Sequence, residues 1–394
     1  MPPPESEERT HTKVWEHRTV HPVDTFSRLE PILKTVGVTR IADITGLDRV
    51  GIPVLQAIRP MGRSLSLSQG KGETVEAARI SALMESIEIW HAETEMLAEQ
   101  SATKEELAGE RFLDPELLLR PGLWPRSDDR LFAWTLGTNC ADCEATLVPR
   151  DAANLDFTRE ANPPWLLRST DGLAGGNTKG EAMSSALAEV IERSCRDEFE
   201  RADARERARR RLDPSLVSDD SERVGRLVAA INEAGLEIEL FEMTNAVGLT
   251  AIRAVIYDFK SAGAIPYPCV GHGAHLDPES ALVRAVTEAA QARLTHISGN
   301  RDDLDPSFYD NAAAANLSRT IERNMDLAGP RRGLDLTDLS GKSPEADFDR
   351  MLEMVLAVGA GPVLLLDLTK EDLGIPVVKV FAPCLRGGLR IKAN

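Results

Sequence analysis

The sequence lacks the features that mark several large classes of protein. It has only five cysteines among 394 residues, at scattered positions, which excludes a disulfide framework. It has no run of about 18 uninterrupted apolar residues, because charged residues, glycines and a proline break the best candidate, 351–368. The first twelve residues are polar and acidic, unlike a signal or transit peptide. These absences predict a cytoplasmic protein without a membrane segment.

Positive charge is also in deficit. The chain has 46 lysines and arginines against 63 aspartates and glutamates, a formal net charge of −17. Such a surface repels phosphate backbones and anionic lipids, so neither nucleic acid nor a membrane is expected as a partner. A ligand with phosphate groups would therefore need a metal ion beside it. Aromatic residues make up only 5%, whereas 42% apolar and 28% charged residues are typical of a globular protein.

Along the chain, helical apolar periodicity alternates with short β-branched runs, without a strict βαβ rhythm. We therefore expect an α+β fold with mixed sheets and packed helices. Residues 1–12 are expected to be a disordered tail and 13–394 a single integrated domain. The densely charged segment 196–213 predicts a solvated helix end followed by a tether, with a partner-docking helix as the alternative. The expected strands are 38–44, 51–59, 131–136, 145–148, 236–243, 249–258, 363–368 and 377–382.

An internal repeat is the main signal of organisation. Three times, a polar loop with glycines leads into an Ala-rich helix with acidic or amide side chains, at 68–88, 175–193 and 271–293. The alignment places Glu85 with Glu189 and Glu288, at spacings of 104 and 99 residues. These spacings are too long for a solenoid. We expect the fold to bring the three units together.

Each of these helices carries a narrow stripe on which acidic residues lie among small or polar ones, when projected at about 100° per residue. Carboxylates one turn apart repel each other, and burying them is costly unless a cation neutralises them. Mg²⁺ binds oxygen ligands and usually accompanies substrate phosphates, so it is the expected cation. The three stripes are Ala77, Ala78, Ser81, Glu85, Glu88 and Ala92; Glu181, Ser185, Glu189 and Glu192; and Arg284, Glu288 and Gln291.

The loops before the helices suit a nucleotide, because small residues let backbone N–H groups approach phosphate and a helix N-terminus favours negative charge. Gly70-Lys71-Gly72 is nevertheless no Walker A loop. No glycine stands five residues before Gly70, and no serine or threonine follows Lys71. A dinucleotide-binding fingerprint is also absent, because Gly359-Ala360-Gly361 precedes an expected strand and does not follow one.

Three blocks of the sequence resemble the motifs with which YcaO proteins build their non-Walker ATP site. The resemblance covers about residues 37–303, and the flanks 37–54 and 297–304 further resemble the subgroup that works beside a TfuA partner. The blocks are SQGKG with Ser81-x-x-x-Glu85-x-x-Glu88, Asn177-x-x-x-Glu181 with Glu189-x-x-Glu192-Arg193, and Glu288-x-x-Gln291-x-Arg293.

The resemblance implies ATP and Mg²⁺ as cofactors and assigns roles to residues of the three blocks. The implied metal ligands are Glu85, Glu88, Glu189 and Glu192. The implied nucleotide-binding residues are Ser68, Lys71, Ser81, Asn177, Glu181, Arg193, Glu288 and Gln291. Glu181, Arg193, Gln291 and Arg293 are the implied catalytic residues.

The reaction implied by the resemblance is ATP-dependent activation of a backbone amide in a ribosomally made peptide. A nucleophile adds to the amide carbon, the oxygen takes a phosphoryl group from ATP, and phosphate then leaves; clustered acids with Mg²⁺ suit this chemistry. Azoline-forming members end in a Pro-rich tail, and no proline follows Pro383 here. We therefore expect thioamide formation with a TfuA-like partner. An azoline-forming cyclodehydratase and a non-catalytic ATP-binding scaffold are the alternatives, and a homodimer is left open.

The remaining cysteines and histidines give weaker signals. Cys140 and Cys143 form a lone pair in an expected hairpin turn; structural zinc needs four ligands, so an inert turn is expected and a metal or redox role is the alternative. Cys195, Cys269 and Cys384 are expected to pack in the interior. His272 and His275 lie in the third loop, where they are expected to lie near the nucleotide or the substrate. The alternative for His275 is a local capping role. We expect His11, His17 and His21 to face solvent, and His91 and His296 to lie on helix surfaces.

Overall fold

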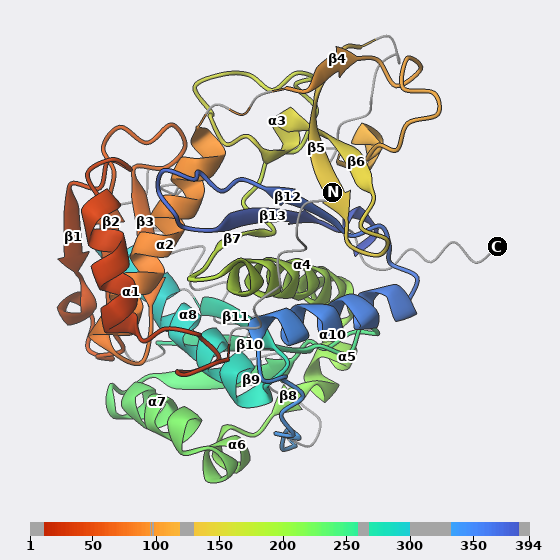
Figure 1. The fold of residues 1–394 in the computed structure, drawn as a ribbon. Coiled ribbons are helices and arrows are strands. Elements are labelled where there is room, and N and C mark those ends of the chain that lie inside the picture. The colour runs from red at the N-terminus through yellow and green to blue at the C-terminus, as the bar shows by residue number, and fades with distance from the viewer. Residues whose placement is uncertain are drawn as a thin grey trace, which may run out of the picture.

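The computed structural model describes residues 12–94, 96, 98–118, 130–258, 268–299 and 332–385. Within these residues, sheets of three, four and six strands combine with helices that pack on them and between them (Figure 1). This arrangement confirms the expected α+β class. None of the described helices is long and apolar enough to cross a membrane. The expected tail lies outside the described residues except for Thr12, as do most of the 297–304 flank and all of the chain after Leu385.

The first sheet is a three-stranded antiparallel meander in the order β1-β2-β3. Helix α2 packs against β2 and β3, and α1 packs against α2. The α2 side chains Ala82, Leu83 and Ile87 are fully buried, so this helix is anchored by its apolar faces. The elements are α1 (Pro22–Leu29), β1 (Arg40–Asp43), β2 (Val54–Ile58), β3 (Leu67–Lys71) and α2 (Val75–Glu93).

The second sheet has four antiparallel strands in the order β11-β10-β9-β8. Helix α8 packs against β10 and β11, and α7 packs against α8 and β9. Leu240, Ile252 and Val286 are fully buried in the core that joins them. The elements are α5 (Ala204–Arg209), β8 (Arg211–Leu212), α6 (Pro214–Asp220), α7 (Glu222–Glu233), β9 (Glu237–Glu242), β10 (Thr250–Tyr257), β11 (Cys269–His275) and α8 (Pro278–Ser298).

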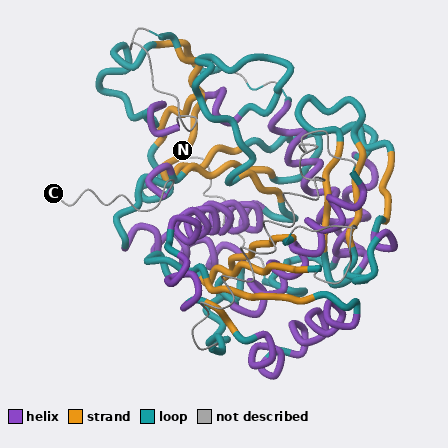
Figure 2. Tube along the Cα trace, turned by 180° about the vertical axis from the view of Figure 1, so that it is seen from behind, coloured by secondary structure: helices purple, strands orange, loops and turns teal. Residues whose placement is uncertain are grey.

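The third sheet has six strands, in the order β4-β5-β12-β13-β7 with β6 paired to β5. Helix α4 packs against β7 and β13 of this sheet and also against β10 and β11 of the second. It therefore lies between the two sheets, as Figure 2 shows from behind. The elements are β4 (Gln100–Ala102), β5 (Phe132–Asn139), β6 (Ala145–Pro149), α3 (Arg150–Ala153), β7 (Leu173–Gly175), α4 (Lys179–Arg201), α10 (Pro344–Ala357), β12 (Leu364–Asp367) and β13 (Val377–Phe381).

The three repeated segments fold as three strand–helix units, β3–α2, β7–α4 and β11–α8, which confirms the internal repeat. A side-chain cap begins each helix: Thr74, Thr178 and Asp277 each accept a hydrogen bond from a backbone N–H of the first turn. The prediction of polar loops before the helices was wrong for the first and third units, because 68–71 and 271–275 are in strands; in the second unit only Gly175 is in a strand. Glycines and polar side chains hid the alternation that signals a strand.

The glycines of these strands allow the strand to approach the helix closely. A Cβ atom on Gly70 would overlap with the backbone of Ala78 and Ala82, and one on Gly271 with the backbone of Ala285 and Ala289. Small residues on both sides of this contact explain why the helices are rich in alanine. The sequence predicted that these glycines expose backbone N–H groups to phosphate. In the structure, Gly70 and Gly271 instead pack against the helix backbone, where a larger residue would not fit.

The prediction of a tether within 196–213 was also wrong. Helix α4 continues to Arg201, α5 follows, and β8 joins the second sheet beside β9. Arg211 and Leu212 of β8 are buried, and the Arg211 guanidinium is ion-paired with Glu239. Sheet pairing and this buried ion pair account for the order of the segment. All eight expected strands are present, as β1, β2, β5, β6, β9, β10, β12 and β13.

Candidate functional site

An open cavity of about 830 Å³ lies where the three strand–helix units meet. The stripes on α2, α4 and α8 form much of its wall, and residues 15–18 of the N-terminal segment border it. The repeat thus brings together side chains that are about a hundred residues apart in the sequence. The predicted site residues that line the cavity are Lys71, Ser81, Glu85, Glu88, Asn177, Glu181, Glu189, Glu192, Arg193, Glu288 and Gln291.

Backbone amides of the strands hold acidic side chains of the helices at equivalent places in two units. In the first unit, Gln69 N donates to Glu85 Oε2 at 3.0 Å. In the third, His272 N donates to Glu288 Oε1 at 3.2 Å, and both pairs are separated by 16 residues. This match supports the alignment of Glu85 with Glu288. It also means that strand amides predicted to face phosphate orient carboxylates here.

The other acids expected to bind metal differ in how they are held. Gly175 N of β7 donates to Glu88 Oε1 at 2.7 Å, which links the first unit to the second. Glu189 accepts from Gly172 N at 3.2 Å and from the Arg193 guanidinium at 3.1 Å. Glu192 is 8% exposed, and no donor among the described residues hydrogen-bonds its carboxylate. Within the described residues, Glu192 is therefore a buried acid without a hydrogen-bond donor, and only the charges of Arg193 and Arg284 favour its ionised form.

The surroundings oppose ionisation of three of these acids. Glu88 is partly open to the cavity but lies deep among protein atoms, and burial together with the neighbouring Glu85 and Glu189 raises its pKa to about 8. Burial and the nearby Glu288 raise the pKa of Glu192 to about 7. The pKa of Glu189 is also raised, mainly by burial. A divalent cation among these carboxylates would relieve their repulsion.

Glu288 differs from these acids because a lysine and a histidine N–H stabilise its charge. Lys71 Nζ lies 2.5 Å from Glu288 Oε2, and His272 Nδ1 lies 3.8 Å from Oε1. Burial opposes its ionisation, but Lys71 and His272 outweigh burial and hold the pKa of Glu288 well below the usual range. Arg253 donates to His272 Nε2 at 3.3 Å, which assigns the ring proton to Nδ1, facing Glu288. Lys71 and Glu288 thus form a fixed ion pair on the cavity wall.

Glu181 is bound by the N-terminal segment. Its carboxylate accepts from Thr19 N and Thr19 Oγ1, both at 2.6 Å, and from Asn177 N at 2.9 Å. Arg18 lies 3.6 Å from the same carboxylate. Burial would raise its pKa, but Arg18 and the Thr19 donors outweigh burial and lower it. Thr25 also donates to Asn177 Oδ1 at 3.0 Å, so residues near the N-terminus contact two of the eight predicted nucleotide-binding residues, Asn177 and Glu181.

Cationic and amide side chains complete the wall. Arg193 is ion-paired with Glu189 and with Asp171, and Arg284 lies on the third stripe near Glu192. Gln291 Nε2 donates to the backbone oxygen of Gln69 at 3.0 Å, which joins the third unit to the first. These groups offer positive charge and donors to an anionic ligand beside the acids.

Ser68 and Arg293 do not line the cavity. Ser68 is 3% exposed within β3. Arg293 is 4% exposed, and its guanidinium is ion-paired with Asp48 at 2.7 Å and with Asp258 at 3.3 Å. The prediction of a catalytic role for Arg293 was therefore wrong. Arg293 is a buried structural residue that joins α8 to Asp48 and Asp258. Its place on the helix faces away from the stripe of Glu288 and Gln291.

Several histidine predictions need correction. His91 is fully buried, with Nδ1 2.8 Å from Ile87 O, and is no surface residue. His17 does not face solvent, because it lines the cavity and bonds Asp277 at 3.1 Å. His272 and His275 also line the cavity, on β11. Of the others, His21 is exposed as predicted, His296 is only partly exposed, and His11 lies outside the described residues.

The cysteine predictions are mostly confirmed. Cys195 and Cys269 are buried, whereas Cys384 is exposed and the prediction of packing there was wrong. Cys140 and Cys143 are free thiols in the turn between β5 and β6. Burial raises the pKa of Cys140 to about 11, so its thiol is protonated and unreactive at neutral pH. An inert turn is consistent with this.

Three residues of the site were missed. Arg18 and Thr19 follow shortly after the expected tail 1–12, and no local pattern signals that they hold Glu181. Gln69 was not predicted as a site residue, although it lies within SQGKG, directly before Gly70. Its side-chain Nε2 is buried and has no acceptor among the described residues.

The residues fit ATP and Mg²⁺. The carboxylates of Glu85, Glu88, Glu189 and Glu192 provide an all-oxygen donor set, and the raised pKa values of the last three show that the protein alone does not neutralise them. The orphaned Nε2 of Gln69 is a donor that a phosphate oxygen would satisfy.

Comparison with known proteins agrees with this donor set. The family model "YcaO cyclodehydratase, ATP- and Mg²⁺-binding" matches residues 69–386. An uncharacterized protein of Methanothermobacter thermautotrophicus is 34% identical, with 96% of this chain and 99% of that protein covered. An uncharacterized protein in the tfuA 3′ region of Rhizobium leguminosarum bv. trifolii is 31% identical, with 93% and 88% covered.

A solved structure gives the same result for the fold. YcaO from Methanopyrus kandleri, bound with AMPPCP and Mg²⁺, matches with a TM-score of 0.75 and 25% identity, over 96% of this chain and 95% of that one. The family match confirms ATP and Mg²⁺ as the expected cofactors. The chain belongs to the YcaO family.

Proposed function

We propose that this chain is an ATP- and Mg²⁺-dependent enzyme that activates a backbone amide of a ribosomally made peptide, and that it forms a thioamide together with a TfuA-like partner. The convergence of Glu85, Glu88, Glu189 and Glu192 at one cavity carries the enzymatic part of this proposal. The relative encoded in a tfuA 3′ region supports the thioamide and the partner.

The proposed roles follow from the contacts of each side chain. The four carboxylates would hold Mg²⁺, and Asn177 with Glu181 would hold the nucleotide at the start of α4. When bound, ATP supplies the phosphoryl group that converts the amide oxygen into a leaving group. Phosphoryl transfer asks the protein mainly for positioning and charge neutralisation. Arg193, Arg284 and Lys71 provide cationic groups on the same wall for the charge on transferred oxygens.

The size of the cavity suits a nucleotide. Its volume of about 830 Å³ is in the upper part of the range of ~300–1,000 Å³ for sites that enclose a single small molecule.

The test is the mass of a product peptide. The enzyme, a TfuA-like protein and a short precursor peptide are incubated with ATP, Mg²⁺ and sulfide. We expect the peptide to gain the mass difference between sulfur and oxygen, and E192Q to yield no product. Loss of the mass of one water would identify an azoline and contradict the thioamide.

A scaffold that binds ATP without turnover is the other candidate. If the chain is a scaffold, ATP should be hydrolysed no faster with the wild-type chain, partner and peptide than in buffer alone. Phosphate release that requires the peptide supports the enzyme, and phosphate release at the background rate contradicts it.

A further inference from the structure

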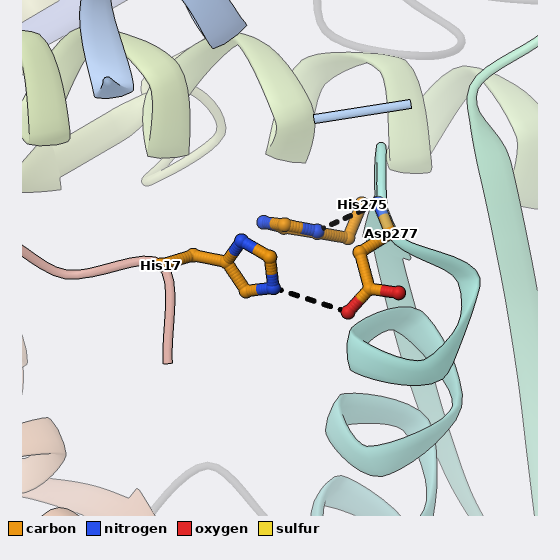
Figure 3. Close-up of side chains that lie close together, drawn as sticks. All are labelled: His17, His275 and Asp277. Carbon is orange, nitrogen blue, oxygen red and sulfur yellow. Dashed lines mark hydrogen bonds and ion pairs between the residues drawn. The ribbon is translucent and has the colours of Figure 1, made fainter. Parts of the chain in front are cut away.

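A second group of metal-ligating side chains lies at the rim of the cavity. His17, His275 and Asp277 each bring a ligand atom to within 4.8 Å of the other two (Figure 3). We propose that these three residues form a binding site for a divalent transition metal ion such as Zn²⁺, which fastens the N-terminal segment to the start of α8. The proposal does not depend on the proposed enzymatic function.

The donor set selects a different ion from the one expected at the acids. Two imidazole nitrogens and one carboxylate oxygen suit Zn²⁺, Co²⁺ or Ni²⁺. Mg²⁺ prefers oxygen ligands, which the four glutamates supply. The imidazole donors therefore favour a transition metal ion at the rim, and the all-oxygen set favours Mg²⁺ at the acids.

The backbone on both sides of the cluster places these donors together. His17 has φ 65° and Glu16 has φ 39°, a left-handed conformation that is uncommon for residues other than glycine. This turn brings the His17 ring to 4.5 Å from the His275 ring, measured between centroids. Such strained residues concentrate at functional sites. Figure 3 shows the His17 ring pointing at Asp277 from a segment far away in the sequence.

Asp277 is fixed by the helix that it caps. Its carboxylate accepts from Ser280 N at 3.1 Å and from Ser280 Oγ at 2.6 Å. Ligands that are themselves hydrogen-bonded hold a metal ion in a defined orientation.

The hydrogen bonds of the cluster can rearrange when an ion enters. His17 Nε2 lies 3.1 Å from Asp277 Oδ2, and Lys13 Nζ lies 3.3 Å from His17 Nδ1. Because an ammonium group only donates, the ring proton is on Nε2. Coordination at Nε2 moves this proton to Nδ1, where Ser340 Oγ at 3.5 Å accepts it, and Lys13 keeps its ion pair with Asp347 at 2.6 Å.

His275 also has a hydrogen bond that a metal ion would replace. His275 Nδ1 accepts from Asp277 N at 2.9 Å, and coordination through this nitrogen replaces that hydrogen bond. The ion would thus bridge residues 260 positions apart. The same N-terminal segment holds Glu181 through Arg18 and Thr19, so the ion would fasten the segment that borders the cavity.

The test is calorimetric titration of Zn²⁺ into the full chain, freed of metal with EDTA, dialysed, and saturated with Mg²⁺ so that the carboxylates are occupied. We expect one Zn²⁺ per chain. His17→Gln and His275→Gln should each weaken binding by at least about tenfold, since each removes a ligand. His21→Gln is the matched control, because His21 is an exposed histidine four residues along the same segment. It should bind Zn²⁺ as the wild type does.

A second readout keeps the test decisive if His275→Gln fails to fold. Co²⁺ in place of Zn²⁺ reports nitrogen ligands through its visible absorption, and H17Q alters only a ligand in the N-terminal segment. Loss of this spectrum in H17Q supports the site. The proposal is overturned if the wild type binds no Zn²⁺ beyond its Mg²⁺-competed sites, or if H17Q binds Zn²⁺ as tightly as the wild type.

Discussion

At the residue scale, Glu88 and Glu192 are the acids whose surroundings oppose charge most strongly. Their pKa values of about 8 and about 7 mean that both still bind protons near neutral pH in the absence of metal. Glu181 and Glu288, in contrast, are ionised because Arg18, Thr19, Lys71 and His272 surround them. The cavity thus contains two kinds of acid: Glu88 and Glu192, whose charge the protein does not neutralise, and Glu181 and Glu288, which lie beside a cationic side chain.

This difference predicts how stability depends on pH. An acid whose pKa is raised by folding binds more protons in the folded state, so stability falls as pH rises through the folded pKa. Between pH 7 and 8 we expect the metal-free protein to lose on the order of 1 kcal/mol of unfolding free energy. The buried histidines have lowered pKa values and act in the opposite direction, but an unfolded histidine has lost most of its proton above about pH 7.

Urea unfolding at pH 7 and pH 8, in EDTA and in Mg²⁺, measures this effect. Saturating Mg²⁺ should remove the dependence, and E88Q should reduce it in EDTA. A wild-type protein that is equally stable at both pH values in EDTA would contradict the assigned pKa values.

The charge of Glu192 should matter for turnover and not for folding. Glu192→Gln keeps the shape of the side chain but removes a metal ligand, so we expect ATP hydrolysis to fall by about 100-fold. The melting temperature of the metal-free protein should stay the same or rise, because a like charge is lost. Glu189→Gln should behave in the same way.

The matched control for these variants is Glu76→Gln, an exposed glutamate in the first turn of α2. It should hydrolyse ATP at the wild-type rate. The metal assignment fails if both cavity variants also retain that rate.

At the element scale, β3 and β11 pack closely on α2 and α8, and glycine makes this contact possible. Gly271→Ala places a methyl group against the backbone of Ala285 and Ala289, where neither side is a flexible side chain. We expect a loss of about 2–3 kcal/mol of unfolding free energy, measured by urea unfolding. Gly46→Ala is the control, because open space surrounds Gly46. Equal stability of the two variants would show that the contact is not tight.

The helices could be predicted from the sequence, whereas the strands before them could not. Apolar periodicity and threonine or aspartate caps mark α2, α4 and α8 clearly. In β3 and β11, glycines occupy the positions that face the helix, so no apolar alternation remains to be recognised. The segment 196–213 was misread for a related reason, because the charge of Arg211 concealed a buried ion pair with Glu239.

At the scale of the whole molecule, the site depends on contacts that no local pattern reports. The stripes of acids were recognisable because each is confined to one helix, and their convergence followed from the repeat. The N-terminal segment was not recognisable, since Thr19 meets Glu181 across 162 residues and His17 meets Asp277 across 260. Arg293 was misassigned because its spacing in the motif does not reveal that its helix face is turned to Asp48 and Asp258.

The central claim is that acids from three remote units form one site for ATP with Mg²⁺, and joint stabilisation by the two ligands tests it most directly. A ligand that binds only the folded state adds about 2.7 kcal/mol at ~100 times its dissociation constant. The melting temperature should rise by several degrees with ATP and Mg²⁺, and much less with ATP and EDTA or with Mg²⁺ alone. Equal shifts with ATP in the presence of Mg²⁺ and of EDTA would contradict a site built from metal-binding carboxylates.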